Sequence, residues 1–446
     1  MKINICFVFS LLSFVSFTSC NTTEPPPPDG EKPTLELKLE DVSCTEAWIT
    51  LKTTNLQLPA TITLKQYNPN NDSTSQTYVL NTQDTLLYID SLLPNQTYKI
   101  LAAMQQPVPM GYNNASNELC VTTLDTTSHN FTFETFTFGG TAGSSSLYDV
   151  AIINENNIWA VGEIMITDTS ENGYTMYNAT HWNGGQWELL RIPYIFQGDS
   201  FYNPIYAIFA FNADDIWFGI GNLIHWNGTK YIPIDISTVF PSLVNKIWGS
   251  SNSNLYVVGN NGSIVFYNGS QWRRIESGTD LPIRDIWGDF NIRTSTYEIL
   301  AVAAEVAINN GSKVLRIDGS SVTEEINNGL SWDVGGIWFK SGSKYYIAGA
   351  GIHYKHFLSD SIWNRYLPGV VTNYVGYGTR GSDINDVFAA GSFLEIAHFN
   401  GLSWHNYLDE ISSTSGAFGR IVVKGNMMVA VGSESGRALI VIGKRN

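Results

Sequence analysis

The chain has 446 residues, enough for two or three domains, and its 39 glycines, 13% aromatic content and shortage of helical patterns favour an all-β fold. A net charge of −15 without any cluster of Lys and Arg argues against binding to nucleic acid, because contacts to phosphates need grouped basic side chains. Charged residues make up only 15% of the chain, which is low for a cytosolic protein.

Residues 1–19 have the features of an export signal. Lys2 supplies a minimal basic region, and the apolar stretch from residue 3 to residue 17 is too short to span a bilayer as a helix. The end of this segment, Phe17-Thr18-Ser19-Cys20, resembles the lipobox of bacterial lipoproteins, with Phe17 where Leu is usual. That resemblance implies a lipid on Cys20 and an anchor at the outer membrane or cell surface; an ordinary signal peptide is the alternative.

Residues 20–32 form a Pro-rich linker, in which four consecutive prolines at 25–28 predict a stiff spacer. Loss of Cys6 with the signal and lipidation of Cys20 leave Cys44 and Cys120 as an even pair. In an exported protein we expect these two to form a disulfide.

Residues 33–125 contain several short strand patterns separated by turn residues, which predicts a β-sandwich. The segment Leu92-Leu93-Pro94-Asn95-Gln96-Thr97-Tyr98 resembles the part of fibronectin type III domains that carries the tyrosine corner, and Trp48 lies where that family buries a Trp. The resemblance implies a spacer or a binding surface and no catalysis.

Residues 129–446 contain seven repeats of one unit. The unit is clearest at residues 247–272, where the runs 255–258 and 264–267 are separated by turn residues and followed by Asn268-Gly269. An Asn-Gly pair between apolar runs predicts a hairpin in which both residues have positive φ. The end of the second strand recurs at Gly259, Ala303, Gly349, Gly391 and Gly432, a spacing of roughly 40–50 residues that is typical of a β-propeller with four-stranded blades.

The turn before the fourth strand has the most regular pattern. Four residues after each turn Asn or Asp an apolar side chain recurs, which predicts one face packed between neighbouring blades; these positions are Trp187, Tyr231, Trp272, Val322 and Trp404. The repeats resemble the bacterial propellers of the photosystem II assembly-factor-like group, with the form Trp-Gly…Val-Gly-x-x-Gly-x-Ile…Gly-x-x-Trp. This resemblance implies a seven-bladed β-propeller and says almost nothing about function.

The seventh repeat ends one strand short, whereas residues 130–138, in which Phe alternates with polar residues, lack a place in the first repeat. An open ring would leave unpaired strand edges. We therefore predict that residues 130–138 pair with residues 437–442 as the outer strand of the last blade.

No motif predicts an enzyme. His181, His225 and His398 occupy one repeated position in separate blades, so a structural role is favoured; His353 and His356 lie on opposite faces of a strand, so no metal site is predicted. The Gly-x-x-Trp endings resemble the Asp box of sialidases without its Asp. Walker, His-Glu-x-x-His and Gly-x-Ser-x-Gly motifs are missing from the sequence, and no cofactor is expected.

The first repeat carries extra chain at residues 163–180 and 193–204, and both insertions are predicted at the same end of the propeller. Loops on a rigid scaffold often carry function. The candidate ligand-binding residues there are Asp168, Tyr174, Tyr177, Tyr194, Phe201 and Tyr202. Alternatively, these side chains only pack against each other. Secondary candidates at the funnel of the propeller are Asp149, Asn245, Arg284, Asp285 and Arg420.

Taken together, the sequence favours an exported all-β protein, held at the membrane only through its lipid, that binds a glycan or an envelope protein through the propeller. The alternative is a carbohydrate-active hydrolase or lyase that uses acidic residues in the funnel. Paired carboxylates within reach of one bond would favour the enzyme, and a funnel without them would favour binding.

Overall fold

A computed structural model describes residues 32–105, 114–305, 311–411 and 415–446. The signal segment, Cys20 and most of the Pro-rich linker lie outside these residues. All regular secondary structure in the described part is β-strand, numbered β1 to β37. That part of the chain contains no helix long and apolar enough to cross a membrane.

The N-terminal strands form a sandwich of two sheets. One sheet has the order β1-β2-β5 and the other the order β4-β3-β6-β7. Trp48 on β2 is fully buried and Tyr98 on β6 is nearly so, as the resemblance to fibronectin type III domains implied. The strands are β1 (Thr34–Val42), β2 (Ala47–Thr54), β3 (Ala60–Tyr67), β4 (Ser73–Leu80), β5 (Asp84–Ile89), β6 (Thr97–Met104) and β7 (Leu119–Thr122).

The expected disulfide between Cys44 and Cys120 is wrong, because both thiols are free in the structure. Cys44 is buried in the connection between β1 and β2, and its thiol donates to the carbonyl of Asp125 at 3.1 Å. Cys120 is exposed on β7, which belongs to the other sheet. The even number of cysteines indicates nothing about the direction of their side chains, and disulfide geometry requires that direction.

We predict that a maleimide labels Cys120 in the native protein and leaves Cys44 unlabelled until the protein is unfolded. Burial raises the pKa of the Cys44 thiol to about 11, which leaves little reactive thiolate at neutral pH. Peptide mass mapping before and after unfolding measures this. A peptide pair linked through Cys44 and Cys120 would contradict it.

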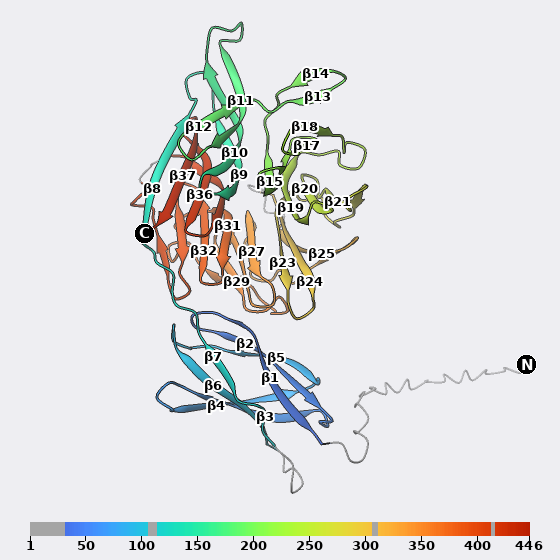
Figure 1. Ribbon diagram of the computed structural model, residues 1–446, viewed down its shortest axis with the longest axis vertical. Coiled ribbons are helices and arrows are strands. Elements are labelled where there is room, and N and C mark those ends of the chain that lie inside the picture. Colours follow the sequence, from blue (N-terminus) through green and yellow to red (C-terminus); the bar gives the residue numbers. More distant parts are fainter. Residues whose placement is uncertain (1–31, 106–113, 306–310, 412–414) are drawn as a thin grey trace, which may run out of the picture. The chain divides into compact units, whose positions relative to one another are not determined.

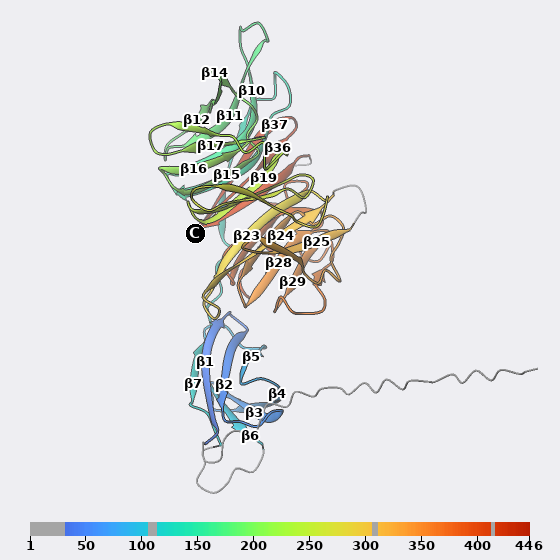
Figure 2. The ribbon, with the colours of Figure 1, turned by 90° about the vertical axis from the view of Figure 1, so that its right-hand side faces the viewer.

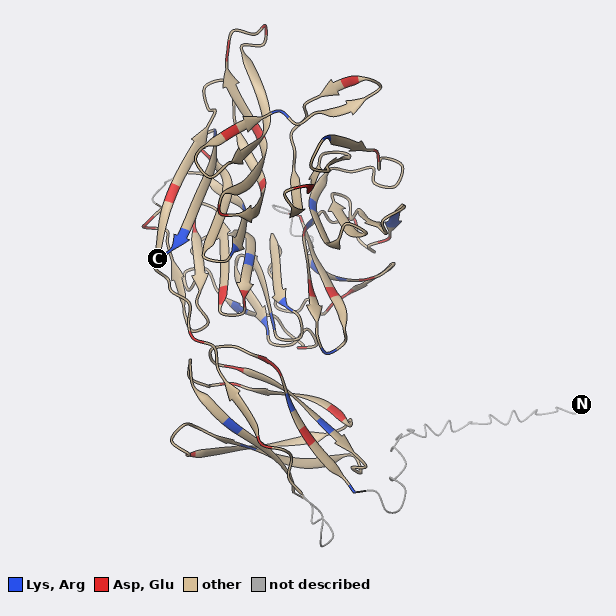
Figure 3. Cartoon of the chain, viewed as in Figure 1, with Lys and Arg blue, Asp and Glu red and all other residues tan. Residues whose placement is uncertain are grey.

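The remaining strands form seven four-stranded antiparallel sheets, the blades of a propeller (Figures 1 and 2). Charged residues are sparse along these strands (Figure 3), as expected where both faces of a sheet are covered. Six blades consist of consecutive strands, and the seventh combines β35, β36 and β37 with β8. The chain divides into two compact units, one with most of the sandwich and one with the propeller and the segments Glu40–Trp48 and Tyr88–Thr97.

From blade 1 to blade 7, the strands have the following bounds. Blade 1 has β9 (Ser146–Asn154), β10 (Asn157–Thr167), β11 (Tyr174–Trp182) and β12 (Trp187–Leu190); blade 2 has β15 (Ala207–Asn212), β16 (Asp215–Gly219), β17 (Leu223–Trp226) and β18 (Tyr231–Ile234); blade 3 has β19 (Val244–Ser251), β20 (Asn254–Gly259), β21 (Ile264–Tyr267) and β22 (Trp272–Ile275). Blade 4 has β23 (Ile283–Asn291), β24 (Thr296–Ala304), β25 (Ser312–Asp318) and β26 (Ser321–Glu324); blade 5 has β27 (Gly336–Lys340), β28 (Lys344–Gly349), β29 (Gly351–Lys355) and β30 (Asn364–Tyr366). Blade 6 has β31 (Gly376–Asp383), β32 (Asp386–Gly391), β33 (Ile396–Phe399) and β34 (Trp404–Asn406); blade 7 has β35 (Ala417–Lys424), β36 (Met427–Glu434), β37 (Arg437–Arg445) and β8 (Phe131–Phe138).

The Asn-Gly turns before the fourth strands differ from the expected geometry. In the turn at 268–269 only Gly269 has positive φ, and the Asn268 side chain accepts hydrogen bonds from the amides of Ser270 and Gln271. The side-chain oxygen of Asn268 therefore stabilises a turn that is longer than the expected two-residue hairpin loop. In the preceding turn of the same blade, Asn261 and Gly262 both have positive φ.

The apolar positions that follow these turns lie between blades, as predicted. Each belongs to the core that its own blade shares with the blade before it: Trp187, Tyr231, Trp272, Val322 and Trp404. Blade 5, whose repeat is irregular, buries Trp363 in the corresponding core. The ring is thus held by apolar cores between neighbouring blades, and any missing strand would expose two of them.

Strand β8 closes the ring by pairing with β37 in a continuous register from Phe138 opposite Ala438 to Phe131 opposite Arg445 (Figure 1). The predicted closure is confirmed. The Phe pattern is not one alternation, because it changes phase at Glu134-Thr135. Phe131 and Phe133 consequently pack in the core between blades 6 and 7, whereas Phe136 and Phe138 pack between blades 7 and 1.

We predict that Phe131→Ala lowers the free energy of unfolding by about 3 kcal/mol, because a buried ring is removed from a core that cannot refill the space. Thr135→Ala, an exposed substitution on the same strand, serves as the control and changes it by less than about 1 kcal/mol. Urea unfolding of both variants measures the difference. Equal effects would show that β8 does not hold the ring closed.

Candidate functional site

A pocket of about 470 Å³ lies where the inner strands of the propeller begin. Its size is within the range of small-molecule sites. Besides Ser146 and Ser433, its polar side chains are tyrosines, arginines and an asparagine: Tyr148, Tyr206, Asn245, Arg284, Tyr377 and Arg420. Three of the funnel candidates, Asn245, Arg284 and Arg420, are therefore brought together here.

β-Bulges direct these side chains into the pocket. The register of an inner strand against its neighbour shifts by one residue at Tyr148, Asn245, Arg284 and Tyr377. A bulge leaves one residue unpaired and re-aims its side chain. In blade 7 the shift falls at Gly419, which has no side chain, and the next residue, Arg420, lines the pocket instead.

Tyr148 and Tyr206 form one wall of the pocket, and Tyr377 of blade 6 also lines it. The rings of Tyr148 and Tyr206 are stacked with centroids 5.2 Å apart, and both are half-buried. The Tyr148 hydroxyl donates to Glu163 at 2.6 Å, and the Tyr377 hydroxyl accepts from Ser392 at 3.0 Å. This wall offers a flat aromatic surface with hydroxyl groups at its edge.

Arg420 crosses the channel from β35 to the opposite side. Its Nη2 donates to the carbonyl of Arg284 at 2.8 Å and to that of Asn245 at 3.5 Å, and its Nη1 donates to the carbonyl of Gly419 at 2.9 Å. Its Nε is buried without a hydrogen-bond partner among the described residues. Carbonyl groups hold this guanidinium in place without neutralising its charge.

Arg284 is less restrained. Its Nε donates to the carbonyl of Ala304 at 2.9 Å, and the described residues provide no hydrogen bond to its two Nη groups. Burial, and then the nearby positive charge of Arg420, lower the pKa of Arg284, whereas Glu305 acts in the opposite direction. The site thus contains two guanidinium groups that repel each other.

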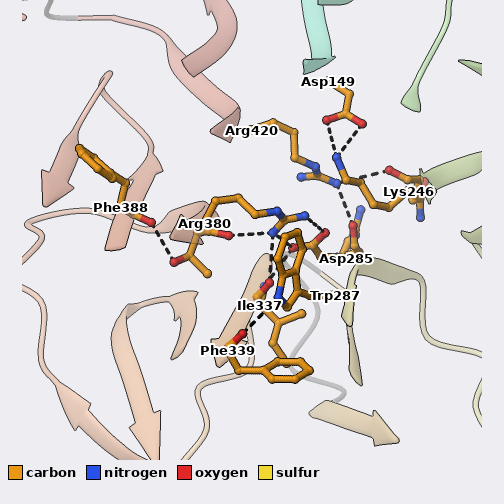
Figure 4. A network of polar contacts seen from close by, with 12 residues as sticks. Asp149, Lys246, Asp285, Trp287, Ile337, Phe339, Arg380, Phe388 and Arg420 are labelled. Atoms are coloured by element: carbon orange, nitrogen blue, oxygen red, sulfur yellow. Dashed lines mark hydrogen bonds and ion pairs between the residues drawn. The ribbon is translucent and has the colours of Figure 1, made fainter. Parts of the chain in front are cut away.

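Below the pocket, two buried ion pairs fill the channel (Figure 4). Lys246 contacts both oxygens of Asp149 at 2.6 and 2.7 Å. Arg380 makes two parallel hydrogen bonds to Asp285 at 2.6 and 2.7 Å and lies over the ring of Trp287. Asp149 and Asp285 also accept the backbone amides of Ile208 and Ile337, which joins adjacent blades.

Asp285 is held as the ionised partner of Arg380, and Asp149 is the contact partner of Lys246. Burial opposes ionisation of Asp285, but Arg380 beside it lowers the pKa of that carboxyl below its ordinary value. Burial lowers the pKa of Lys246, and the adjacent Asp149 counteracts this effect. Each aspartate is less than 2% exposed, so neither reaches a molecule in the pocket.

Arg380 can reach Asp285 because the inner strands of blades 5 and 6 each have a glycine at a position where blades 3 and 4 have a side chain. Arg380 itself occupies the position held by Trp248, Trp287 and Trp338 in blades 3, 4 and 5. A Cβ atom at Gly336 would lie 2.7 Å from the backbone nitrogen of Thr379. The glycine allows the close approach of β27 and β31 that lets Arg380 reach Asp285.

The two insertions of blade 1 emerge at the pocket end, as predicted, because β10 ends opposite the start of β9. The first forms the projecting hairpin of β10 and β11, and the second a separate ribbon of β13 (Tyr194–Phe196) and β14 (Asp199–Phe201) (Figure 1). The aromatic residues of these insertions differ widely in burial. None of the insertion candidates is among the residues that line the central pocket.

Several of these candidates have packing roles. Tyr194 is buried and its hydroxyl accepts from Asn222 at 2.9 Å, while Tyr177 packs against the core between blades 7 and 1. Arg191 lies 3.8 Å from the ring centroid of Tyr202. These three aromatics thus have contacts with the blades or with Arg191, and not with each other as the alternative interpretation proposed.

The other candidates lie farther out on the insertions. Phe201 is 46% exposed on β14, and Tyr174 is half-buried at the start of β11. Asp168, at the hairpin tip, is exposed and accepts a hydrogen bond from the Thr175 hydroxyl at 2.5 Å. The hydroxyl and backbone amide of Ser170, together with Thr175, lower the pKa of this carboxyl.

The repeated histidines have the same contacts in three blades. Each ring stacks on an aromatic residue of its own blade and contacts the side chain at the start of the second strand: His181 with Asn157, His225 with Asp215 and His398 with Asp386. His353 is buried and accepts the backbone amide of Ser331 at 3.1 Å. No group of His, Cys, Asp or Glu suited to a metal ion occurs among the described residues.

Sequence reasoning missed Tyr148, Tyr206 and Tyr377. A usable signal was present, because Tyr148, Asn245 and Arg284 each lie one residue before a channel residue, namely Asp149, Lys246 and Asp285. Aligning the inner strands at that position would have predicted the lining of the pocket.

Comparison with known proteins supports the fold. No protein-family model and no curated protein matches the chain. The solved structure "YCF48 bound to D1 peptide" has 14% sequence identity and a TM-score of 0.52, covering 72% of this chain and 97% of that chain. The FN5 domain of Drosophila Lar matches with 18% identity over 21% of this chain and 95% of its own, with a TM-score of 0.16.

β-1,2-Mannobiose phosphorylase from Listeria innocua has 9% identity and a TM-score of 0.29, covering 72% of this chain and 93% of its own. Identities this low indicate fold at most, and the two TM-scores below 0.5 support no further conclusion. The chain is all-β, with a fibronectin type III-like sandwich and a seven-bladed β-propeller.

We predict that Asp285→Asn destabilises the protein by about 3–5 kcal/mol, because it leaves the buried Arg380 without its counterion. The double variant Asp285→Asn/Arg380→Met removes both charges and regains most of that loss. Glu324→Gln, which breaks the exposed pair with Lys313, is the control and changes stability by less than about 1 kcal/mol. Urea unfolding that shows no difference between Asp285→Asn and the control would refute a structural role for the buried pairs.

Proposed function

We propose that this chain is an exported, lipid-anchored protein that binds a glycan or an envelope protein through the propeller. The observation that carries this proposal is the central pocket, which presents tyrosines and arginines. Its carboxylates lie in the channel underneath, fully buried and paired with cations. Such a pocket has groups that recognise a ligand and no evident acid–base pair.

The same observation disfavours the hydrolase alternative. Glycoside hydrolysis needs two carboxyl groups that flank one bond, about 5–9.5 Å apart. Among the described residues, no Asp or Glu lines the pocket, and Glu163 contacts it through the Tyr148 hydroxyl. A single carboxylate at the edge of the pocket does not supply both roles.

The location rests on the N-terminal sequence. A lipid on Cys20, the Pro-rich linker to residue 32 and the sandwich at 33–125 would hold the propeller at 129–446 away from the bilayer. In this arrangement the sandwich is a spacer and the propeller is the binding domain. The outer membrane or cell surface is the proposed location.

Two measurements test this function. Membrane fractionation of the Cys20→Ala variant should find the protein released, because the proposed anchor is the lipid on Cys20; unchanged partitioning without lipid mass on Cys20 would refute the anchor. A glycan array together with an envelope pull-down should identify a ligand whose binding is lost when the pocket is altered by Tyr206→Ala. Tyr297→Ala, an exposed tyrosine outside the pocket, is the matched control.

A further inference from the structure

The charges around the channel do not balance. Four cationic side chains converge there, and only two aspartates are paired with them: Lys246 with Asp149 and Arg380 with Asp285. The remaining two cations, Arg284 and Arg420, line the pocket. The pocket is thus positive at its floor in a protein whose formal net charge is −15.

Neighbouring carboxylates do not remove this surplus. Glu163 is not among the lining residues and accepts the Tyr148 hydroxyl, and Glu305 influences Arg284 through its charge. No salt bridge to Arg284 or Arg420 occurs within the described residues. Two repelling guanidinium groups in a half-buried site are stabilised when an anion lies between them.

We infer that the pocket binds an acidic saccharide, with the sugar carboxylate at Arg284 and Arg420. This inference deepens the proposed binding function and rests on it. Arg284 presents its two Nη groups as a planar fork suited to a carboxylate. Arg420 is already fixed by three backbone carbonyls, so it supplies charge from a preorganised position.

The rest of the pocket suits the neutral part of a sugar. The stacked, half-buried rings of Tyr148 and Tyr206 present an apolar face with hydroxyl groups at its edge, which matches the face of a pyranose ring. The Asn245 amide nitrogen is engaged by Asn260 and the Ile283 carbonyl, which orients its oxygen as an acceptor. A volume of about 470 Å³ accommodates one or two sugar units.

Isothermal titration of the purified full chain with digalacturonate and with the neutral digalactoside tests the inference. We expect digalacturonate to bind at least about tenfold more tightly than the neutral sugar, and its binding to weaken as salt is raised. Arg284→Gln should reduce affinity for digalacturonate at least about tenfold, because charge-assisted hydrogen bonds are lost. Arg284→Lys should retain part of that affinity, since the charge remains and the fork does not.

Controls separate a binding effect from a folding effect. Arg273→Gln, an exposed arginine on β22, should leave binding unchanged. Tyr206→Phe should retain the stacking surface and most affinity, whereas Tyr206→Ala should lose it; thermal melts show whether each variant is folded. Arg420 is not substituted, because its carbonyl contacts join inner strands of three blades.

The outcomes distinguish this inference from the broader function. Equal affinity for acidic and neutral sugars, unchanged binding in Arg284→Gln, no detectable binding of digalacturonate, or tighter binding of an acidic peptide would each overturn the acidic-saccharide inference. A ligand identified by the array or pull-down would still support a binding protein in those cases. Failure of both screens would refute the binding function itself.

Discussion

Pairing of β8 with β37 is the interaction on which the rest of the propeller depends. Seven inner strands can surround one channel only if the ring is closed, and the chain closes it with a strand that precedes the first blade. The change of phase in the Phe pattern lets β8 fill the cores on both sides of blade 7. The strand that closes the ring therefore also packs blades 6, 7 and 1 together.

The closed ring has a consequence for charge. Side chains from different inner strands are forced into a narrow channel where isolated charges are costly, so Asp149 and Asp285 are each matched with a cation. The bulges then turn the preceding residues upward into the pocket. As a result, Asp149 and Asp285 are paired with Lys246 and Arg380 inside the channel. Arg284 and Arg420 line the pocket above them, where a ligand can reach them.

Most of the architecture could be predicted from the sequence because it depends on local repetition. Apolar runs, turn residues and the regular position of Trp187 and its equivalents indicate four-stranded blades without knowledge of long-range contacts. The site was predicted only in part. Asn245, Arg284 and Arg420 were identified, but Asp149 and Asp285 were grouped with them although they are buried counterions.

The reasons for the misses are physical. A β-bulge shifts the alternation of a strand by one residue, so the side chains facing the pocket cannot be assigned from alternation alone. The predicted disulfide is wrong for a related reason. Counting an even pair cannot show that Cys44 is buried in the connection between β1 and β2 while Cys120 is exposed on a strand of the other sheet. Burial of Tyr194 and stacking of Arg191 on Tyr202 likewise depend on contacts between insertions and blades.

The central claim is that Asp149 and Asp285 are paired with cations inside the closed ring, so that Arg284 and Arg420 in the pocket bind an anion from outside the chain. A crystal structure of the full chain soaked with digalacturonate tests this most directly. The account predicts a carboxylate within hydrogen-bonding distance of Arg284, next to Arg420, with the sugar ring against Tyr148 and Tyr206, while Asp149 and Asp285 keep their pairs with Lys246 and Arg380. A structure in which Arg284 forms a salt bridge with a protein carboxylate such as Glu305, and the pocket holds no sugar, would contradict it.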